Sequence, residues 1–183
     1  RSTLFPYTTL FRSSIIIMSE ILRKNESITE KIQNIELIKM KIEDIPQIAE
    51  IFISYWGAMC LYSDYEFERI ISQNISYVYK INDEVIAFCL MEYIFEEDEV
   101  NIDLLCVKKE FKGNHLGEKL LSFCINYCLE LECNNFTLQV STKNVPALNL
   151  YRKLGFVVSG FLKNYYDDEA PGERDAYSMV LNI

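Results

Sequence analysis

Apolar residues recur along this chain in two periods, and the periods predict helices and strands in a definite order. Spacings near 3.6 residues are typical of amphipathic helices, and short apolar runs between turn residues are typical of strands. We expect strands over residues 35–40, 76–81, 84–95, 100–107, 136–140, 156–161 and 177–183. We expect helices beginning after residue 44 and over residues 64–72, 116–132 and 144–154.

Individual residues support several of these boundaries. Asp44 can cap the first helix, and Pro46 suits its first turn. Asn82 and Asp83 form a hairpin signal between two strands, and Gly155 is a suitable residue to end the last helix. The predicted apolar helix faces consist of Ile45, Ile48, Phe52 and Tyr55, then Phe67, Ile70 and Ile71, then Leu116, Leu120, Phe123, Cys124, Tyr127, Cys128 and Leu131.

The order of the elements predicts an α/β fold. It favours a mixed, mostly antiparallel central sheet of about six or seven strands with helices on both faces. Segments 84–95 and 100–107 are apolar at consecutive positions, so both faces of these strands are expected to be covered. The 183 residues suit one domain, which we place at 35–183 after a polar tail at 18–34. Residues 1–17 look like a translated sequencing adapter, with Met18 as the expected start.

Charge and hydrophobicity narrow the range of partners. The net charge of −9 disfavours nucleic-acid binding, which needs Lys and Arg to neutralise phosphates. It fits a cationic or amine-bearing substrate, although solubility alone explains it equally well. Half of the residues are hydrophobic, which supports a packed core. No run approaches the roughly 18 apolar residues of a membrane span. We therefore expect neither a nucleic-acid partner nor a membrane partner.

Cysteine and histidine usage points away from metal chemistry. The six cysteines form no CxxC pair and lie mostly in apolar runs. This is typical of reduced core thiols, so we expect an intracellular, cytoplasmic protein. The single histidine leaves no plausible zinc site, and no metal is expected.

Residues 108–117 join a predicted strand to a predicted helix and have features of a phosphate-binding loop. A helix N-terminus presents unpaired N–H groups and the positive end of the helix dipole. Gly113 and Gly117 let the backbone approach a ligand closely, while Lys108, Lys109 and Lys112 add positive charge. An ordinary strand-to-helix turn is the competing interpretation, because short glycine-containing turns are common.

A second segment follows after one helix and one strand. Asn144 caps the predicted helix 144–154, and Tyr151 lies near its end. Taken singly, a capping Asn and a buried Tyr are more often structural than catalytic. Their order makes the combination more specific, because loop, helix, strand and capped helix fall within about 45 residues.

Both segments are similar to motifs of one family. The first reads Lys112-Gly113-Asn114-His115-Leu116-Gly117 and is similar to the Arg/Gln-x-x-Gly-x-Gly/Ala loop of the Gcn5-related N-acetyltransferases. The second, residues 144–156, is similar to their Asn-x-x-Ala-x-x-Leu-Tyr-x-x-x-Gly-Phe segment. The resemblance extends over residues 35–183. Residues 61–63, 163–166 and 175–179 look like the subgroup that acetylates protein N-termini, including the ribosomal-protein alanine acetyltransferases.

This resemblance implies a donor site for acetyl-CoA. The residues that the family would place along it are Leu105, Cys106, Val107, Lys112, Gly113, Asn114, His115, Leu116, Gly117, Asn144 and Lys153. The backbone of residues 105–107 would bind the pantetheine arm like an added strand, and N–H groups near Cys106 and Val107 would polarise the thioester carbonyl. Residues 112–117 would hold the pyrophosphate. Tyr151 would be the general acid that protonates the leaving thiolate.

Two features depart from the family pattern. His115 stands where the loop usually has Gly, and we expect cofactor binding to survive if this residue keeps a negative φ. The usual base positions carry Gln139 and Asn101, neither of which accepts a proton at neutral pH. Asp103 shares a strand face with Asn101 because strand side chains alternate, and it is the candidate base, acting through water. Glu99 is the reserve, and for both acids a solvated carboxylate at a strand end is the alternative.

The acceptor chemistry favours a protein N-terminus. An α-amine has a pKa of about 7.8 and a lysine amine one of about 10.4, so deprotonation near pH ~7.2 costs about 0.8 and about 4.4 kcal/mol. A weak or water-relayed base therefore suits an α-amine. We expect an Nα-acetyltransferase that works by direct attack of the amine in a ternary complex, on protein or peptide N-termini, with ribosome association as an option.

Four residues are expected to line the peptide slot: Tyr62, Gln139, Tyr165 and Tyr166. Plain packing is an equal alternative for the tyrosines. Two other functions stay open. A small-amine acetyltransferase, for example one that uses a polyamine, fits the acidic charge. A non-catalytic acyl-CoA-binding protein fits the loss of both usual base positions.

Overall fold

The computed structural model describes residues 31–56, 63–166 and 174–183. The expected adapter segment 1–17, most of the tail 18–34 and Tyr62 lie outside these residues. Residues Glu36–Ile183 form one compact unit, to which the strands and helices below belong.

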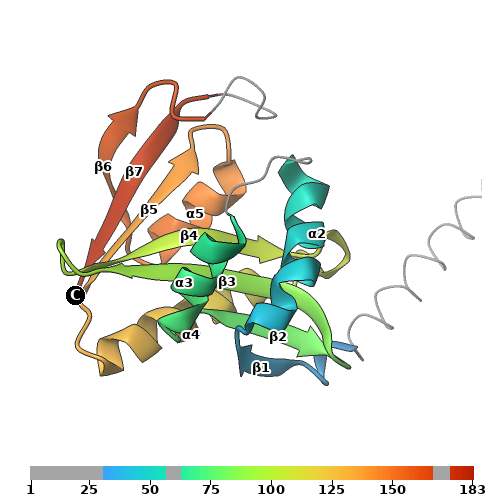
Figure 1. The fold of residues 1–183 in the computed structure, drawn as a ribbon. Helices are drawn as coiled ribbons and strands as arrows, with labels where there is room; N and C mark the ends of the chain where they lie inside the picture. Colours follow the sequence, from blue (N-terminus) through green and yellow to red (C-terminus); the bar gives the residue numbers. More distant parts are fainter. Residues whose placement is uncertain (1–30, 57–62, 167–173) are drawn as a thin grey trace, which may run out of the picture. The chain divides into compact units, whose positions relative to one another are not determined.

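A seven-stranded sheet forms the centre of this unit (Figure 1). Its strands are β1 (Glu36–Lys39), β2 (Tyr77–Ile81), β3 (Glu84–Ile94), β4 (Glu99–Val107), β5 (Asn135–Ser141), β6 (Val157–Leu162) and β7 (Ala176–Asn182). They lie in the order β1-β2-β3-β4-β5-β7-β6. Every neighbouring pair is antiparallel except β4 and β5. The prediction of a mixed, mostly antiparallel sheet is confirmed.

Helices cover both faces of the sheet, as predicted. They are α2 (Ile45–Trp56), α3 (Asp64–Ser72), α4 (Leu116–Glu130) and α5 (Val145–Lys153), with short 3-10 turns at Ile42–Asp44 and Lys109–Phe111. One buried cluster joins α2 and α3 to one face, and a larger cluster joins α4 and α5 to the other. Figure 1 shows α2 and α3 in front of the sheet and α4 and α5 behind it. Within the described residues, no helix combines the length and the apolar character needed to cross a bilayer.

The central strand β3 is buried on both faces, as its consecutive apolar residues predict. Cys89 and Met91 belong to the cluster under α4, whereas Phe88 and Leu90 belong to the cluster under α2 and α3. All four side chains are fully buried. Burying a Phe, Leu or Met side chain stabilises a fold by about 1.5–3 kcal/mol. The core therefore holds β3 firmly, and β4 is anchored by pairing with it along most of its length.

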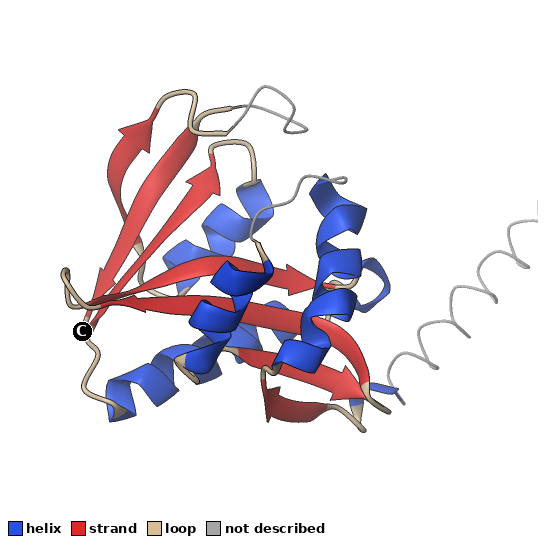
Figure 2. Cartoon of the chain, in the orientation of Figure 1, coloured by secondary structure: helices blue, strands red, loops and turns tan. Residues whose placement is uncertain are grey.

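The two parallel strands β4 and β5 are paired only where they begin. Their ladder consists of Val100 opposite Phe136 and Asn101 opposite Thr137. Beyond these residues the strands diverge, and β5 continues beside β7 (Figure 2). Among the described residues, no strand pairs with the second half of β4 along the edge that faces β5.

A β-bulge in β4 lies at the same place. Leu90 pairs with Leu104 and Met91 with Ile102, which leaves Asp103 as the extra residue. A bulge bends its strand and increases the local twist. The bulge at Asp103 therefore turns the second half of β4 away from β5 and opens one edge of that strand.

The predicted turn at residues 82–83 and the predicted end of α5 are confirmed, and α3 begins with a cap that was not predicted. Asn82 and Asp83 have positive φ values of 48° and 65°, which suits the tight turn between β2 and β3. Gly155 follows α5 with a φ of 95°. The hydroxyl of Ser63 accepts the N–H of Glu66 (3.3 Å), and the Glu66 carboxylate accepts the N–H of Ser63 (2.7 Å). This reciprocal cap explains why α3 begins at the predicted residue.

Asp44 acts one turn earlier than predicted. It lies in the 3-10 turn that leads into α2, and its carboxylate accepts the N–H of Lys41 at 3.0 Å. The same carboxylate forms an ion pair with Lys80 of β2. Asp44 is 2% exposed, so it needs both partners to offset the loss of water.

Helix α4 buries a different arc from the predicted one. Leu121 and Ile125 are buried, whereas Phe123 is 37% exposed and Leu131, which follows the helix, is 51% exposed. The other buried residues of α4 are Leu116, Leu120, Cys124 and Cys128, as expected. Apolar residues occupy most of the circumference of this helix, so the sequence period does not single out one buried face. Packing against the sheet decides which of these residues are buried.

Candidate active site

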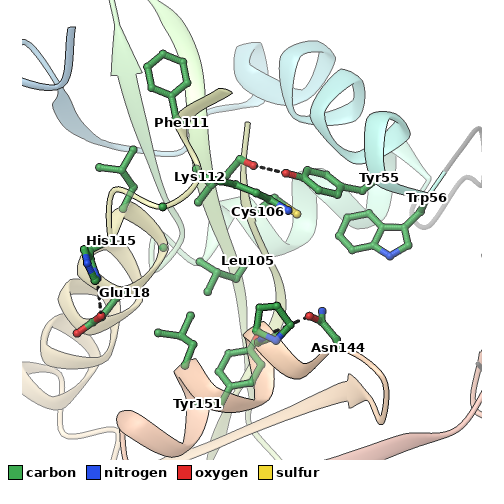
Figure 3. Close-up of a pocket in the computed structure, with 17 residues that line it drawn as sticks. Tyr55, Trp56, Leu105, Cys106, Phe111, Lys112, His115, Glu118, Asn144 and Tyr151 are labelled. Carbon is green, nitrogen blue, oxygen red and sulfur yellow. Dashed lines mark hydrogen bonds and ion pairs between the residues drawn. The ribbon is translucent and has the colours of Figure 1, made fainter. Parts of the chain in front are cut away.

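A cleft of about 600 Å³ lies beside the open half of β4. Its walls come from residues 105–107 of β4, residues 111–118 at the start of α4, residues 144–151 of α5 and the end of α2 (Figure 3). The two sequence segments that were expected to act together therefore meet around one cavity.

Backbone groups of β4 face this cleft at alternate residues. The N–H of Lys108 donates to the carbonyl of Ile86 (2.8 Å), which sets the phase of the antiparallel β3–β4 ladder. In that phase Cys106 turns its N–H and C=O toward β3, and Leu105 and Val107 turn theirs toward the cleft. Leu105, rather than Cys106, thus presents its N–H next to that of Val107.

Two residues of the loop before α4 have left-handed backbone conformations. Gly113 has a φ of 81°, and a Cβ at this position would meet nothing within 4 Å. His115, the N-cap of α4, has a φ of 58°, so the expectation of a negative φ is wrong. This conformation costs a non-glycine residue about 1–2 kcal/mol. The Asn114 amide donates to the carbonyls of Phe111 (3.1 Å) and Lys112 (3.2 Å), which holds the loop in this form.

The lysines of the loop are engaged in contacts with the protein. Lys108 forms an ion pair with Glu84, and Lys109 donates to the backbone carbonyl of Ser54. Lys112 points into the cleft (Figure 3). The loop therefore offers a phosphate chiefly the N–H groups at the start of α4 together with Lys112.

Tyr55, at the end of α2, organises the opposite wall. Its hydroxyl donates to the carbonyl of Val107 (2.6 Å), and the Lys112 ammonium lies 4.3 Å from the centre of its ring. Trp56 lies beside Tyr55 with ring centroids 5.4 Å apart (Figure 3). The sequence analysis counted Tyr55 only as a core residue, and a contact across 52 positions leaves no local signal.

An acidic residue joins the loop to α5. Glu118 lies in the first turn of α4, 2.6 Å from the Lys153 ammonium and 3.3 Å from Nδ1 of His115. The hydrogen bond with Lys153, and secondarily the contact with His115, lowers the pKa of Glu118. Lys153 lies outside the cleft lining, and its ammonium is directed to this carboxylate.

Tyr151 reaches the cleft from α5. Asn144 caps this helix by accepting the N–H of Ala147 (3.3 Å), as predicted. Tyr151 is 8% exposed, and its ring meets Phe156 edge-on at 5.8 Å. Burial raises the pKa of the Tyr151 phenol well above its usual value, with a smaller contribution from neighbouring thiols. The phenol therefore stays protonated at neutral pH and can donate to an atom in the cleft.

Most residues predicted for the donor line the cleft: Leu105, Cys106, Val107, Lys112, Gly113, His115, Leu116, Gly117, Asn144 and Tyr151. Asn114 and Lys153 do not line the cleft. The Asn114 amide donates to carbonyls of the loop, and the Lys153 ammonium pairs with Glu118. The sequence analysis missed Trp56, Phe111 and Leu150. Their sequence signal is apolar character alone, which core residues share.

A polar network occupies the sheet face that carries α2 and α3, at the point where β4 and β5 part. The Asn101 amide donates to Asp103, and the Thr137 hydroxyl lies 3.2 Å from Oδ1 of Asn101 and 3.0 Å from Oε1 of Glu99. The expectation that Asn101 and Asp103 share a face is confirmed. Side chains of β4 stop alternating strictly between the two sheet faces at the bulge. Ile102 and Leu105, one on each side of it, both contact the core cluster under α4 and α5.

Tyr165 and Gln139 complete this side of the site. The Tyr165 hydroxyl donates to Gln139 at 3.5 Å, and its ring meets that of Tyr166 edge-on at 5.0 Å. Burial raises the pKa of Tyr165, with a smaller contribution from the charge of Asp103. Three of the four predicted substrate residues are thus linked through Tyr165, and Tyr62 lies outside the described residues. The residues that line the cleft include neither these three nor Asp103.

The fold and the cleft define a class of protein. A sheet that opens between two strands, with a helix N-terminus and a glycine-containing loop beside the open edge, suits an extended ligand that carries phosphate. The chain belongs to the Acetyltransferase (GNAT) family, whose sequence profile matches residues 45–156, more than half of the 183 residues. It is an acetyl-CoA-dependent N-acetyltransferase, as the motif resemblance implies.

Relatives with several acceptors resemble this chain. A Bacillus subtilis (strain 168) protein assigned as a ribosomal protein bS18-alanine N-acetyltransferase is 29% identical over 145 residues, 79% of this chain and 93% of the relative. The spermine/spermidine N(1)-acetyltransferase of the same strain is 28% identical over 86 residues, 43% of this chain and 57% of the relative. The solved structure of Arabidopsis thaliana Naa50 with the bisubstrate analogue CoA-Ac-MVNAL has a TM-score of 0.69 at 22% identity, covering 82% of this chain and 99% of that one. The structural likeness supports the fold.

Proposed function

We propose that this enzyme acetylates the N-terminal α-amine of a protein or peptide. The observation that carries the proposal is a polar network next to the cleft. The carboxylate of Asp103 lies in the β4 bulge and accepts a hydrogen bond from Asn101, and Gln139 of β5 accepts one from the Tyr165 hydroxyl. The Bacillus subtilis relative whose match covers 79% of this chain is assigned as a ribosomal-protein alanine acetyltransferase, which supports the same acceptor class. We extend the proposal to a cytoplasmic setting, with a ribosomal protein as one acceptor.

The donor half holds acetyl-CoA, which supplies the acetyl group as a thioester. The N–H groups of Leu105 and Val107 suit hydrogen bonds to an extended arm along the β4 edge and to the thioester oxygen. Residues 112–117 and the N-terminus of α4 favour the pyrophosphate. Asn144 contributes by setting the start of α5, which carries Tyr151 into the cleft.

Tyr151 is proposed as the group that gives a proton to the leaving sulfur. The thiolate that leaves from the thioester is a base, since a thiol has a pKa of about 8.5 in model compounds. Burial keeps the Tyr151 phenol protonated at neutral pH, so it can donate a proton to the sulfur as the carbon–sulfur bond breaks.

Asp103 is proposed to accept the proton of the amine through water. Deprotonation near pH ~7.2 costs about 0.8 kcal/mol for an α-amine and about 4.4 kcal/mol for lysine. An ordinary Asp is a weak base, with a pKa of about 3.9 in model peptides. With such a weak base, the barrier to deprotonation is smaller for an α-amine than for a lysine amine.

A small amine is the second candidate acceptor. The similarity to a spermine/spermidine acetyltransferase favours it, although that match covers 43% of this chain. The net charge of −9 is compatible with a polyamine. Membership of the acetyltransferase family favours catalysis over acyl-CoA binding alone.

Acceptor competition tests the proposal with the full chain. The acceptors are short peptides beginning with Ala, Ser or Met, the Ala peptide with a blocked N-terminus and an internal lysine, and spermidine. We expect kcat/KM for the best free-N-terminal peptide to exceed the values for the blocked peptide and for spermidine by at least about tenfold. The reason is that deprotonation alone separates an α-amine from a lysine amine by about 3.6 kcal/mol. Faster acetylation of spermidine or of the blocked peptide would overturn the acceptor assignment. A peptide copied from the N-terminus of bS18 tests the ribosomal acceptor.

A further inference from the structure

Asn101 links the candidate base to the neighbouring strand. Its Nδ2 donates to Oδ1 of Asp103, and its Oδ1 lies 3.2 Å from the hydroxyl of Thr137. Asn101 and Thr137 face each other in the last rung of the β4–β5 ladder before the strands part. Asp103, two residues further on, is the bulge residue. The amide therefore ties the bulge carboxylate to β5 across the point of divergence.

The chemistry of these groups determines which way the amide points. An ionised carboxylate only accepts hydrogen bonds, so the NH₂ group of Asn101 must face Asp103. Its carbonyl oxygen then faces Thr137, whose hydroxyl can donate to it or to Glu99 at 3.0 Å. A flipped amide would bring two oxygens together at Asp103, which is repulsive.

We propose that Asn101 is a positioning residue for Asp103 and that Thr137 holds the Asn101 amide in the orientation this requires. The inference rests on the proposed function, because that function gives Asp103 a task that depends on its position. The bond from Asn101 uses one of about four acceptor sites of the carboxylate and holds the group in one place. Correct placement of a reacting group is a large part of catalysis.

The charged groups around Asp103 explain why residue 101 carries a neutral amide rather than a second carboxylate. Arg69 of α3 forms an ion pair with Glu92 of β3, and its charge also interacts with Asp103. Burial and, secondarily, the charge of Asp103 raise the pKa of Tyr165, and Glu99 shares the Thr137 hydroxyl with Asn101. Because Arg69 is shared with Glu92, a second carboxylate at the amide position would leave an excess of negative charge.

A double-mutant cycle tests the positioning role with a free-N-terminal peptide as acceptor. We expect Asn101→Ala to lower kcat about tenfold while KM for acetyl-CoA stays within about twofold. In the Asp103→Asn background the same change is expected to alter kcat by less than about twofold, because its effect passes through Asp103. Thr137→Val should give a smaller loss with the same pattern. Additive losses in the double variant, or a loss confined to KM for acetyl-CoA, would overturn the inference.

A second measurement does not depend on turnover. The carboxyl carbon of Asp103 is titrated by ¹³C NMR in the wild type and in Asn101→Asp, which places a like charge beside it. We expect the midpoint to rise by about one pH unit or more. The matched control is Asn135→Asp, the same change at an exposed residue whose amide donates to the carbonyl of Asp98, and it should leave the midpoint in place. An unmoved midpoint in Asn101→Asp overturns the inference.

The outcomes separate the two proposals. If the wild type acetylates no amine, the proposed function fails, and the titration then shows only whether residue 101 lies beside Asp103. If the wild type acetylates peptides and Asp103→Asn is fully active, the positioning role fails while N-terminal acetylation stands. Loss of activity in Asp103→Asn, with a non-additive cycle and a shifted midpoint, supports both.

Discussion

The donor cleft and the acceptor network next to it are built in different ways. The donor side uses two continuous stretches, residues 105–118 and 144–151, and works mainly through backbone N–H groups and a helix N-terminus. The acceptor side combines side chains from β4, β5 and the segment after β6. Backbone recognition depends on the fold and tolerates changes of side chain, whereas a side-chain network depends on each member. Donor binding is therefore carried by short motifs, and acceptor choice by residues that no local pattern connects.

One feature nevertheless serves both sides. The bulge at Asp103 opens the edge that presents Leu105 and Val107 to the donor. The same bulge places the Asp103 carboxylate where the strands part. A change of register at this point would alter donor and acceptor sites together, which ties their geometry to one residue.

The largest expected effect separates donor chemistry from donor binding. Tyr151→Phe should lower kcat about 100-fold or more, because proton transfer by a positioned side chain contributes about 10²–10⁴-fold. The dissociation constant of acetyl-CoA should stay within about threefold, since the ring and its contact with Phe156 remain. Steady-state kinetics and calorimetry give the two quantities. The control is Tyr127→Phe on α4, where the hydroxyl contacts Lys39. An unchanged kcat in Tyr151→Phe would remove the acid assignment.

The next effect tests the acceptor side alone. Asp103→Asn should lower kcat/KM for a free-N-terminal peptide about 10- to 100-fold near pH 7, with donor affinity unchanged. The loss should shrink near pH ~9, because an α-amine with a pKa of about 7.8 then loses its proton unaided. Profiles of kcat/KM against pH for both proteins check this. A loss of equal size at both pH values would contradict a role in proton removal.

The left-handed conformation of His115 gives a smaller effect, on stability. His115→Gly and His115→Ala both remove the imidazole and its contact with Glu118, so their difference isolates the backbone. With a φ of 58° at this position, the Gly variant should be more stable than the Ala variant by about 1 kcal/mol. For a chain of this size that is about 2–4 °C in Tm. Equal stabilities in urea or thermal unfolding would contradict the left-handed conformation.

The smallest expected effect concerns charge beside the loop. Glu118→Gln removes a negative charge from the cleft wall and releases Lys153 and His115. We expect the dissociation constant of CoA to fall about two- to fivefold at low salt and less at high salt, because exposed charges are screened. Glu130→Gln, at the far exposed end of α4, is the matched control. Weaker binding in Glu118→Gln would show that this carboxylate organises the loop rather than opposing the phosphate.

Much of the donor side could be predicted from sequence because its signals are local. Asn144 caps α5 within three residues, and Gly155 ends the same helix through its own φ. The order of loop, helix, strand and capped helix then allows only a few arrangements around a sheet. The family resemblance placed residues 105–107 along the donor, but the register between β3 and β4 was needed to show that Leu105 and Val107 turn their backbone groups to the cleft.

The remaining features depend on contacts between distant residues. The bulge at Asp103 is a mismatch of register between β3 and β4, which neither strand shows alone. The hydroxyl of Tyr55 reaches Val107 across 52 positions. Lys153 was expected along the cofactor, but the position of Glu118 on another helix directs its ammonium elsewhere. His115 adopts a positive φ because the loop around it is closed by the Asn114 amide.

The sequence by itself determined the order of strands and helices, the two ends of α5 and the phosphate-type loop, because each depends on the period and conformational preference of neighbouring residues. Tertiary structure alone decided how the sheet opens, which backbone groups of β4 face the cleft and which side chains surround Asp103. These properties follow from register and from packing between elements far apart in the chain. Such contacts form only when the whole sheet assembles.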